Sequence, residues 1–502
     1  MSRPRSGRST AELLADFGHE LPAAPAASIS TRDPRLFATV PAGGPRRPGR
    51  GWSAASVPVS QWRMTSDQAA CLWPMIATPA LPPTGAQLGI DELSGGCFYA
   101  DPLGWVLDEA VPVTNPNVMS YGKPGGGKSA DPKAFITAMF DFGYKALILG
   151  DVKDEYEPLC RSQGVEPFRV GPGLPARLNP LDLGPLGDGW ASLSREEIGR
   201  RAALLFPRWL GLLRSLVASQ HVGDQRVPFS PTDARVLETV LKQLTGYSNG
   251  QHTLQVTTIP AVWDALNNPT NDLIVECRYE SVRQFLDETR LVRDALAQLC
   301  TGALAGMFDD YTTISVDWTA PIQSLSLSRL EALGDEATGI ALACVSSWGR
   351  GMREVKESGD LRINIRDEVW KQMRLGLAAV QNLDADLRLS RRDGEVNWMI
   401  GHKPGDSAGA GNTGTAARAI ASELLALADI KILHGQEARV ADELQALIGF
   451  SPLVHDLITG WATQRPGRAV WCVGPRLYKV QTVLHPIVKA LAFTNQALEG
   501  AA

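Results

Sequence analysis

A glycine-rich stretch between Gly122 and Ser129 has the residue types and spacing needed to hold phosphate groups. It reads GKPGGGKS and fits the pattern G-x-x-x-x-G-K-S. Glycines let backbone N–H groups turn inward around phosphates, while the lysine adds a cation and the serine a hydroxyl for Mg²⁺. We therefore expect Lys128 to reach the β- and γ-phosphates of a nucleotide, and Ser129 to ligate Mg²⁺. The candidate binding residues are Gly122, Lys123, Pro124, Gly125, Gly126, Gly127, Lys128 and Ser129.

The neighbouring segments predict a parallel sheet around this loop. NPNVMSY leads into the loop as a short strand, a helix follows it, and YKALILGD has the pattern of a buried strand. This order of strand, loop, helix and strand is typical of an α/β fold. Asp131 and Pro132 fall early in the helix, where a carboxylate is electrostatically favoured and the missing N–H of proline costs least.

A phosphate-binding loop requires a carboxylate at the end of another strand, and LRINIRDEVWKQ offers Asp367 and Glu368. Asp367 would hold Mg²⁺, and Glu368 would polarise the attacking water. Arg362, Asn364 and Arg366 alternate with isoleucines in this segment, whereas a buried parallel strand is usually almost entirely apolar. A surface Asp-Glu pair is therefore the alternative interpretation.

Further polar residues end other predicted strands. Asp151, Lys153 and Glu155 follow the strand YKALILG, where a parallel sheet presents its functional edge, although such a cluster is also typical of a solvated turn. His402 follows NWMI, and Gln436 follows DIKILHG. Each of these two residues either senses the γ-phosphate or is a structural polar residue.

Composition excludes several classes of protein. The net charge of -5 over 502 residues gives no overall attraction to nucleic acid. The seven cysteines are scattered without a CxxC pair, which indicates neither a disulfide framework nor a zinc ribbon and fits a reducing cytosol. Because Arg208 and Arg214 interrupt ALLFPRWLGLLRSLVA, we expect an amphipathic helix there and no membrane span.

The chain divides into five predicted regions. SREE at 194–197 and SPTD at 230–233 are signals for helix starts, and they place a helical block inside the α/β region. The basic first region is rich in Pro, Ala and Gly and is expected to be disordered, with contact to DNA or lipid as the alternative. The regions are a basic arm at 1–50, a short β-rich lead-in at 51–115, a first core part at 116–190, a helical insertion at 191–305, and a second core part at 306–502.

The order of these motifs resembles one known family. GKPGGGKS, LGDVKDEYEPLC, FRVGPGLPARLNPLDL, RDEVWKQMR, GHKPGDS and ILHGQE follow one another as in conjugative-transfer ATPases of type IV secretion. These form the TraC and VirB-four group of the FtsK/HerA superfamily, and MFDDYTT and IQSLSLSRL are similar to its actinobacterial form. The resemblance implies an α/β, RecA-like P-loop NTPase core that binds ATP and Mg²⁺. It also implies a homo-hexamer in the cytoplasm, attached peripherally to the membrane channel proteins of a secretion system.

The resemblance also implies roles for individual residues. Lys128 and Ser129 match the Walker A positions, and Asp367 and Glu368 match Walker B. His402 falls where many relatives carry a polar sensor after the fourth strand, and Gln436 matches the glutamine that ends the next strand. Arg350 and Arg468 are candidates for an arginine that acts on a neighbouring subunit.

This sequence departs from the family pattern at several positions. Arg366 precedes Asp367, and Asp154 stands where relatives often carry glycine. Asp131 and Pro132 replace apolar residues after the loop. The region ahead of the loop is short, so the large N-terminal docking domain of many relatives is expected to be absent.

We therefore predict an ATP-hydrolysing motor of conjugative DNA transfer or type IV secretion. One alternative is a HerA- or FtsK-like translocase that binds single- or double-stranded DNA. The other is a nucleotide-binding assembly subunit with weak hydrolysis. The departures from the family pattern at Asp131 and Arg366, close to the predicted nucleotide, are the reason for this alternative.

Overall fold

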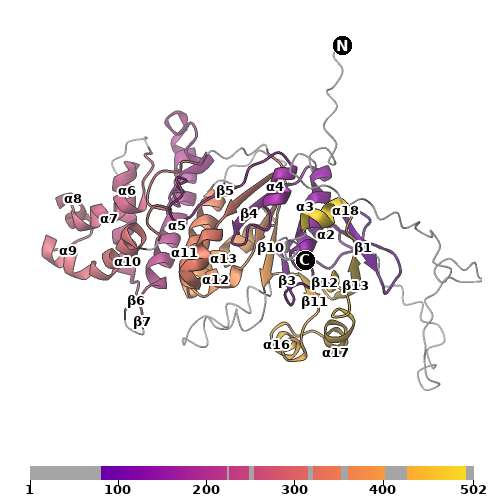
Figure 1. Cartoon of the computed structure of the whole chain (residues 1–502). Helices are drawn as coiled ribbons and strands as arrows, with labels where there is room; N and C mark the ends of the chain where they lie inside the picture. Colours follow the sequence, from indigo (N-terminus) through magenta and orange to yellow (C-terminus); the bar gives the residue numbers. More distant parts are fainter. Residues whose placement is uncertain are drawn as a thin grey trace, which may run out of the picture. The chain divides into compact units, whose positions relative to one another are not determined.

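A computed structural model describes most of the chain after residue 80 (Figure 1). The described residues are 81–222, 225–247, 254–302, 304–314, 320–351, 360–401, 425 and 427–492. They belong to the compact unit Leu81–Ala502. The predictions for the arm at 1–50, for residues 51–80 and for His402 fall outside this part.

One mixed sheet of eleven strands organises the described residues, in the order β2-β1-β13-β12-β11-β3-β10-β9-β4-β8-β5. Neighbouring strands from β5 to β11 run parallel, and those from β11 to β2 run antiparallel. The strands are β1 (Ala86–Asp91), β2 (Cys97–Ala100), β3 (Val118–Tyr121), β4 (Lys145–Asp151), β5 (Phe168–Arg169), β8 (Ile322–Ser326), β9 (Arg362–Arg366), β10 (Glu395–Gly401), β11 (Ile430–His434), β12 (Arg468–Val473) and β13 (Arg476–Thr482).

The parallel half of the sheet gathers the candidate segments at one edge. The glycine-rich stretch follows β3, and the residues after β4, β9 and β11 leave the sheet at the same edge because these strands run in the same direction. In parallel sheets this carboxyl edge is where ligands bind. Because these strands are parallel, the predicted site residues that follow them lie at the same edge of the sheet.

The unusual polarity of β9 has a structural explanation. Arg362, Asn364 and Arg366 are buried together with the isoleucines between them. Asn364 donates to Glu395 Oε2 of the adjacent strand at 2.9 Å, and Arg362 lies 3.2 Å from Asp360. Buried polar groups persist where they have partners, so β9 is a central strand despite its composition.

The antiparallel half contains the predicted hairpin. RAVWCVGPRLYKVQTVL forms β12 and β13, which pair with each other over their whole length. The lead-in joins the same sheet, because β1 pairs with β13 and β2 with β1. A short helix, α2 (Pro102–Leu107), follows β2, and its N-cap is Asp101, whose carboxylate accepts from the Gly104 N–H.

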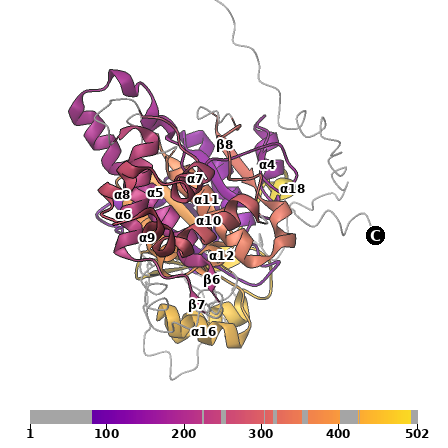
Figure 2. The same ribbon diagram turned by 90° about the vertical axis from the view of Figure 1, so that its left-hand side faces the viewer.

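The segment between β5 and β8 is largely helical and includes the small hairpin of β6 (His221–Val222) and β7 (Gln225–Arg226). Both expected caps are present: Ser194 accepts from the Glu197 N–H at 3.2 Å, and Ser230 forms a capping box with Asp233. Helices α6 to α10 lie side by side in both views (Figures 1 and 2). The helices are α5 (Arg195–Ser219), α6 (Pro231–Thr245), α7 (Ile259–Asn267), α8 (Asn271–Glu276), α9 (Val282–Glu288) and α10 (Arg290–Thr301).

Helix α5 is the one described helix that is long and apolar enough to cross a membrane. Its apolar side chains, among them Leu205, Trp209 and Leu213, are fully buried in the core, and the helix packs against α11 and α13. Most of its charged residues, such as Arg200 and Arg214, are exposed, whereas Arg208 is buried and donates to the Asp182 carbonyl at 2.6 Å. Its composition is thus accounted for by packing within the protein.

Four of the remaining helices, α12, α13, α16 and α17, build a second apolar cluster with β3, β10, β11 and β12. Helix α3 follows the glycine-rich stretch, α11 and α12 precede and follow β9, and α16 and α17 lie between β11 and β12. Their bounds are α3 (Ala130–Met139), α4 (Glu157–Ser162), α11 (Gly334–Gly351), α12 (Val369–Met373), α13 (Leu377–Leu389), α16 (Ala438–Ile448), α17 (Pro452–Asp456) and α18 (Pro486–Ala492).

Candidate nucleotide site

The glycine-rich stretch connects β3 to the N-terminus of α3, which is the context predicted from the sequence. Gly125 and Gly127 have φ angles of 75° and 110°, in the left-handed region where only glycine is free of strain. A Cβ placed on Gly125 would meet nothing within 4 Å, so this side of the loop is open. Backbone N–H groups and the positive end of the helix dipole can therefore face an anion there.

Residues at the end of β11 and just before β12, which are far from the loop in the sequence, contact the loop directly. A Cβ on Gly122 would lie 2.6 Å from the Cβ of His434, the last residue of β11, so only glycine fits. Gly467 N–H donates to the Gly126 carbonyl at 3.0 Å, and Lys123 N–H donates to the Gly435 carbonyl at 3.2 Å. These contacts fix the shape of the loop without any ligand.

Lys128 is buried within the loop, with a relative exposure of 5%. Burial lowers the pKa of its ammonium to about 8, and the charges of Asp367 and Glu368 offset this effect only in part. The structure therefore brings Lys128 close to both predicted carboxylates. A phosphate group would add the negative charge that favours the ammonium form.

Asp367 and Glu368 follow β9 directly and are both buried. Burial raises the pKa of Asp367 to about 6, with further contributions from the charges of Glu368 and Glu155. A divalent cation would relieve this concentration of negative charge, and carboxylate and hydroxyl oxygens are the ligands that Mg²⁺ prefers. Asp367, together with Ser129 at the half-buried start of α3, thus fits a Mg²⁺ site.

Glu368 is held by Lys153, from the charged segment after β4, and by Trp370, and the sequence alone indicated neither contact. Lys153 Nζ lies 2.6 Å from Glu368 Oε1, and the indole N–H of Trp370 donates to Oε2. Glu368 has a φ of 51°, in the left-handed region that is costly for a residue with a side chain. The carboxylate is thus fixed by contacts on both oxygens and by its backbone.

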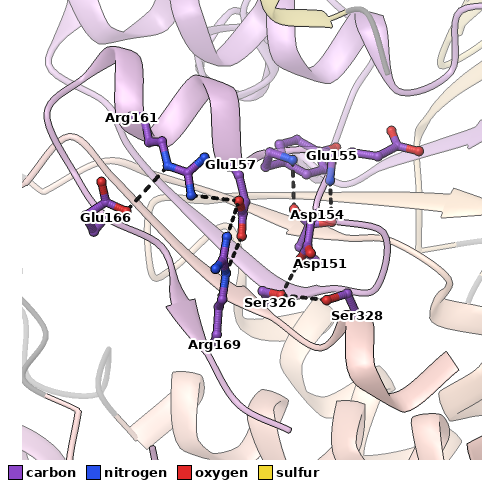
Figure 3. A network of polar contacts seen from close by, with 10 residues as sticks. Asp151, Asp154, Glu155, Glu157, Arg161, Glu166, Arg169, Ser326 and Ser328 are labelled. Carbon is purple, nitrogen blue, oxygen red and sulfur yellow. Dashed lines mark hydrogen bonds and ion pairs between the residues drawn. The ribbon is translucent and has the colours of Figure 1, made fainter. Parts of the chain in front are cut away.

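The charged segment after β4 is an ordered turn at the sheet edge (Figure 3). Asp151 is fully buried, and its two oxygens accept from the N–H groups of Glu155 and Tyr156 at 2.9 and 2.7 Å. Asp154 has a φ of 55°, which explains why glycine is favoured at this position. Its carboxylate contacts the Ser326 hydroxyl at the end of β8.

Glu155 connects this turn to α3. Its Oε2 lies 3.6 Å from Nζ of Lys133, which is buried in the first half of α3. Lys133 also lies over the ring of Tyr156, 5.2 Å from its centroid. The helix that begins at the phosphate loop is therefore anchored to the turn that carries Lys153.

Of the two predicted sensor residues, Gln436 lies within the described part of the chain and His402 does not. Gln436 follows β11 beside the loop; it is buried, and its Nε2 has no hydrogen-bond partner among the described residues. Such an orphaned donor fits a ligand group, so Gln436 stays a candidate. His402 lies outside the described residues, although β10, which it follows, is adjacent to β3.

His434 is the neighbouring residue that sequence reasoning missed. It is completely buried, burial lowers its pKa to about 3, and its imidazole is therefore neutral. Its Nε2 lies 3.5 Å from Asp131 Oδ2, while Thr482 of β13 donates to Asp131 Oδ1 at 2.9 Å. The available signal was its place at a strand end, in the same ILHGQ motif that contains Gln436.

We expect Asp131→Asn to stabilise the nucleotide-free protein above neutral pH. Burial raises the pKa of Asp131 to about 7, against 3.8 for the ordinary carboxyl. Because the folded protein holds this proton more tightly than the unfolded chain, wild-type stability is lost as pH rises from about 4 to 7. The variant should escape this loss, which at about 1.4 kcal/mol per pKa unit amounts to a few kcal/mol.

Urea unfolding at pH 5 and pH 8 measures this difference. Asp141→Asn is the matched control, since Asp141 is exposed just beyond the same helix. An advantage for Asp131→Asn that does not grow with pH would contradict the buried placement of the carboxyl.

Arg366 points away from the phosphate loop. Its guanidinium donates to Ser346 of α11 at 2.9 Å and to Asp386 of α13 at 2.8 Å. A cation beside Glu368 would weaken it as a base, but the Arg366 guanidinium contacts Ser346 and Asp386.

We expect Arg366→Val to leave turnover per folded molecule nearly unchanged but to lower the free energy of unfolding by about 3 kcal/mol. Removing one partner of a buried ion pair has this cost. ATP hydrolysis, normalised to folded protein, and denaturant unfolding measure the two effects. Arg388→Ala removes an exposed pair with Asp384 on α13 and should cost less than about 1 kcal/mol. A strong loss of turnover in folded Arg366→Val would contradict this placement.

The two candidate trans-acting arginines are both held within their own chain. Arg350 Nη1 lies 3.2 Å from Asp386, and Arg468 Nη2 lies 3.1 Å from Glu92. Arg468 also stacks near Trp461, 5.0 Å from the ring centroid. These contacts do not select one of them for a role in a neighbouring subunit.

Known structures share this architecture. No family model matches the sequence, and a search of the curated proteins gave no significant match. VirB4 of Thermoanaerobacter pseudethanolicus matches with a TM-score of 0.60 at 18% identity, covering 82% of this chain and 99% of that structure. The plasmid coupling protein TrwB, solved in complex with ADP and Mg²⁺, matches with a TM-score of 0.52 at 11% identity, covering 80% and 90%.

These likenesses confirm the predicted fold class: a RecA-like α/β core with a large, mostly parallel sheet. The described part of the chain therefore has the fold of VirB4 and of the plasmid coupling protein TrwB, as the resemblance in the sequence implied.

Proposed function

We propose that this protein is an ATPase that powers a conjugative DNA-transfer or type IV secretion system. The observation that carries the proposal is the meeting of buried Lys128 with Asp367 and Glu368 at the mouth of the phosphate loop. The fold of VirB4 and TrwB supports the choice of system. TrwB has been solved with ADP and Mg²⁺, which supports nucleotide and Mg²⁺ as ligands of the corresponding loop here.

Each residue has one task in the proposed reaction. The N–H groups of the loop from Gly122 to Ser129 bind the β- and γ-phosphates, and Lys128 neutralises their charge. Ser129 and Asp367 hold Mg²⁺, which offsets the charge developing on the phosphates when it is bound. Glu368 accepts the proton of the attacking water, and Gln436, whose buried Nε2 has no partner among the described residues, contacts the terminal phosphate.

The proposed assembly is a homo-hexamer on the cytoplasmic side of the membrane, attached through channel proteins of the secretion system. The fold match to VirB4 supports the resemblance to this family. The hexamer and the channel partners are what that resemblance implies. DNA is the proposed cargo of the system, either single- or double-stranded.

A second candidate is a nucleotide-binding assembly subunit with weak hydrolysis. The contacts of Lys153 and Trp370 with both oxygens of Glu368 favour it, because a general base needs an oxygen available to water. Both candidates bind nucleotide through Lys128, so they differ in turnover and not in affinity.

Deleting the gene in its host and measuring plasmid transfer or secretion tests the proposed system. Wild-type protein should restore transfer, and Lys128→Ala, expressed at the same level, should not. Transfer that is unaffected by the deletion would contradict the proposed function.

A further inference from the structure

The ion pair between Lys153 and Glu368 joins two segments that are far apart in the sequence. Lys153 follows β4 and Glu368 follows β9, and these strands are parallel neighbours whose ends lie at the same edge. The distance of 2.6 Å is that of a direct charge-assisted hydrogen bond. Strand pairing therefore places the ammonium of Lys153 directly on the proposed base.

The two partners differ in their exposure to solvent. The side chain of Glu368 is 5% exposed, whereas that of Lys153 is 39% exposed. The carboxylate is also held by Trp370, by its left-handed backbone, and by the N–H of Glu368 itself, which donates to Asp367 Oδ1 at 2.9 Å. Lys153 is the long, flexible and partly solvated partner, so it can leave the pair at a lower cost than Glu368.

The contact competes with catalysis. Hydrolysis requires Glu368 to take the proton of a water whose oxygen bonds to the terminal phosphorus, while the bond from that phosphorus to the ADP oxygen breaks. A water that approaches Oε1 competes with the ammonium of Lys153, whose positive charge also favours the carboxylate over its protonated form, and one that approaches Oε2 competes with the indole of Trp370. Orienting contacts usually leave one oxygen of a general base available to its substrate.

We propose that Lys153 is a positioning residue that holds Glu368 in a resting position and must withdraw before ATP is hydrolysed. This inference rests on the proposed ATPase function and adds a restraint to it. A change at the carboxyl edge of β4, such as contact with a neighbouring subunit, would release the base.

The restraint can be measured with Lys153→Met, which keeps the length of the side chain but removes its charge. We expect kcat for ATP hydrolysis to rise about 3- to 10-fold with KM unchanged, because an ion pair of about 1 kcal/mol no longer has to be broken. Lys153→Arg keeps the cation and should stay near wild type. Lys145→Met removes another ion pair of β4, that with Asp360 at 3.2 Å, and should leave kcat unchanged.

A double variant separates restraint from a general effect on the fold. In a Glu368→Gln background, Lys153→Met should give no increase in kcat, because the group that it releases is absent. A merely structural role would change stability in both backgrounds and leave kcat alone. Lys153→Ala provides the same readout if the methionine variant does not fold.

The outcomes distinguish this inference from the function on which it rests. An unchanged or lower kcat in folded Lys153→Met, or an increase that persists with Glu368→Gln, would overturn the restraint while wild-type ATP hydrolysis stands. No hydrolysis in wild type and in Lys153→Met alike, with ATP bound by both, would overturn the restraint and the proposed motor together.

Discussion

Lys128→Ala should abolish ATP turnover and sharply weaken nucleotide binding. The ammonium is buried where the loop presents its N–H groups, and its charge interacts with those of Asp367 and Glu368 at the end of β9. Removing one preorganised charge donor from a site of this kind costs about 10²-fold or more in turnover. Isothermal titration with ATP and Mg²⁺, together with phosphate release, measures both effects.

Folding should survive this change, because burial already works against the ammonium of Lys128. Lys123→Ala is the matched control, since Lys123 lies in the same loop but is exposed to solvent. We expect that variant to retain most of its turnover. ATP hydrolysis that is equal in Lys128→Ala and wild type would show that the site lies elsewhere.

Glu368→Gln should bind ATP but lose about 10²- to 10⁴-fold in hydrolysis, which is the usual cost of removing a general base. Binding should persist, because Glu368 is assigned to the water and Lys128 to the phosphates. A stalled subunit should also retain ATP, and the assembled ring should last longer. Nucleotide retention on a filter and sedimentation in ATP measure these two consequences.

Glu157→Gln provides a matched control for Glu368→Gln. Glu157 lies on α4, where Arg161 and Arg169 hold its carboxylate, as Figure 3 shows. Its removal should leave ATP hydrolysis close to wild type. If ATP dissociates as fast from Glu368→Gln as from Lys128→Ala, the division of tasks between the two residues is wrong.

Local patterns were sufficient to predict the parts of the site that depend on one strand and the residues after it. The loop after β3, the carboxylates after β9 and the hairpin of β12 and β13 each have their signal within a short segment. Ser230 and Pro231 likewise marked the start of α6 through cap chemistry that involves only a few residues. Such features can be predicted because their cause is local.

Contacts between distant segments could not be predicted in this way. Lys153 and Glu368 are 215 residues apart, and His434 at the end of β11 meets Asp131 of α3, the helix that follows the neighbouring strand β3. The polar residues of β9 seemed unsuited to a central strand. The reason is that Asp386, the partner of Arg366, lies on a later helix and cannot be identified from the sequence of the strand itself. In each case burial makes a polar group costly, and only the fold supplies the partner that offsets the cost.

Steady-state hydrolysis of ATP with Mg²⁺ by wild type and Glu368→Gln, at concentrations that permit ring assembly, tests the central claim most directly. ATP binding must be measured on the same samples, so that loss of turnover is not confused with loss of substrate. The account predicts that both proteins bind ATP and that wild type turns it over at least about 10²-fold faster. A wild type no faster than Glu368→Gln, with ATP bound by both, would contradict the motor and identify a passive nucleotide-binding subunit.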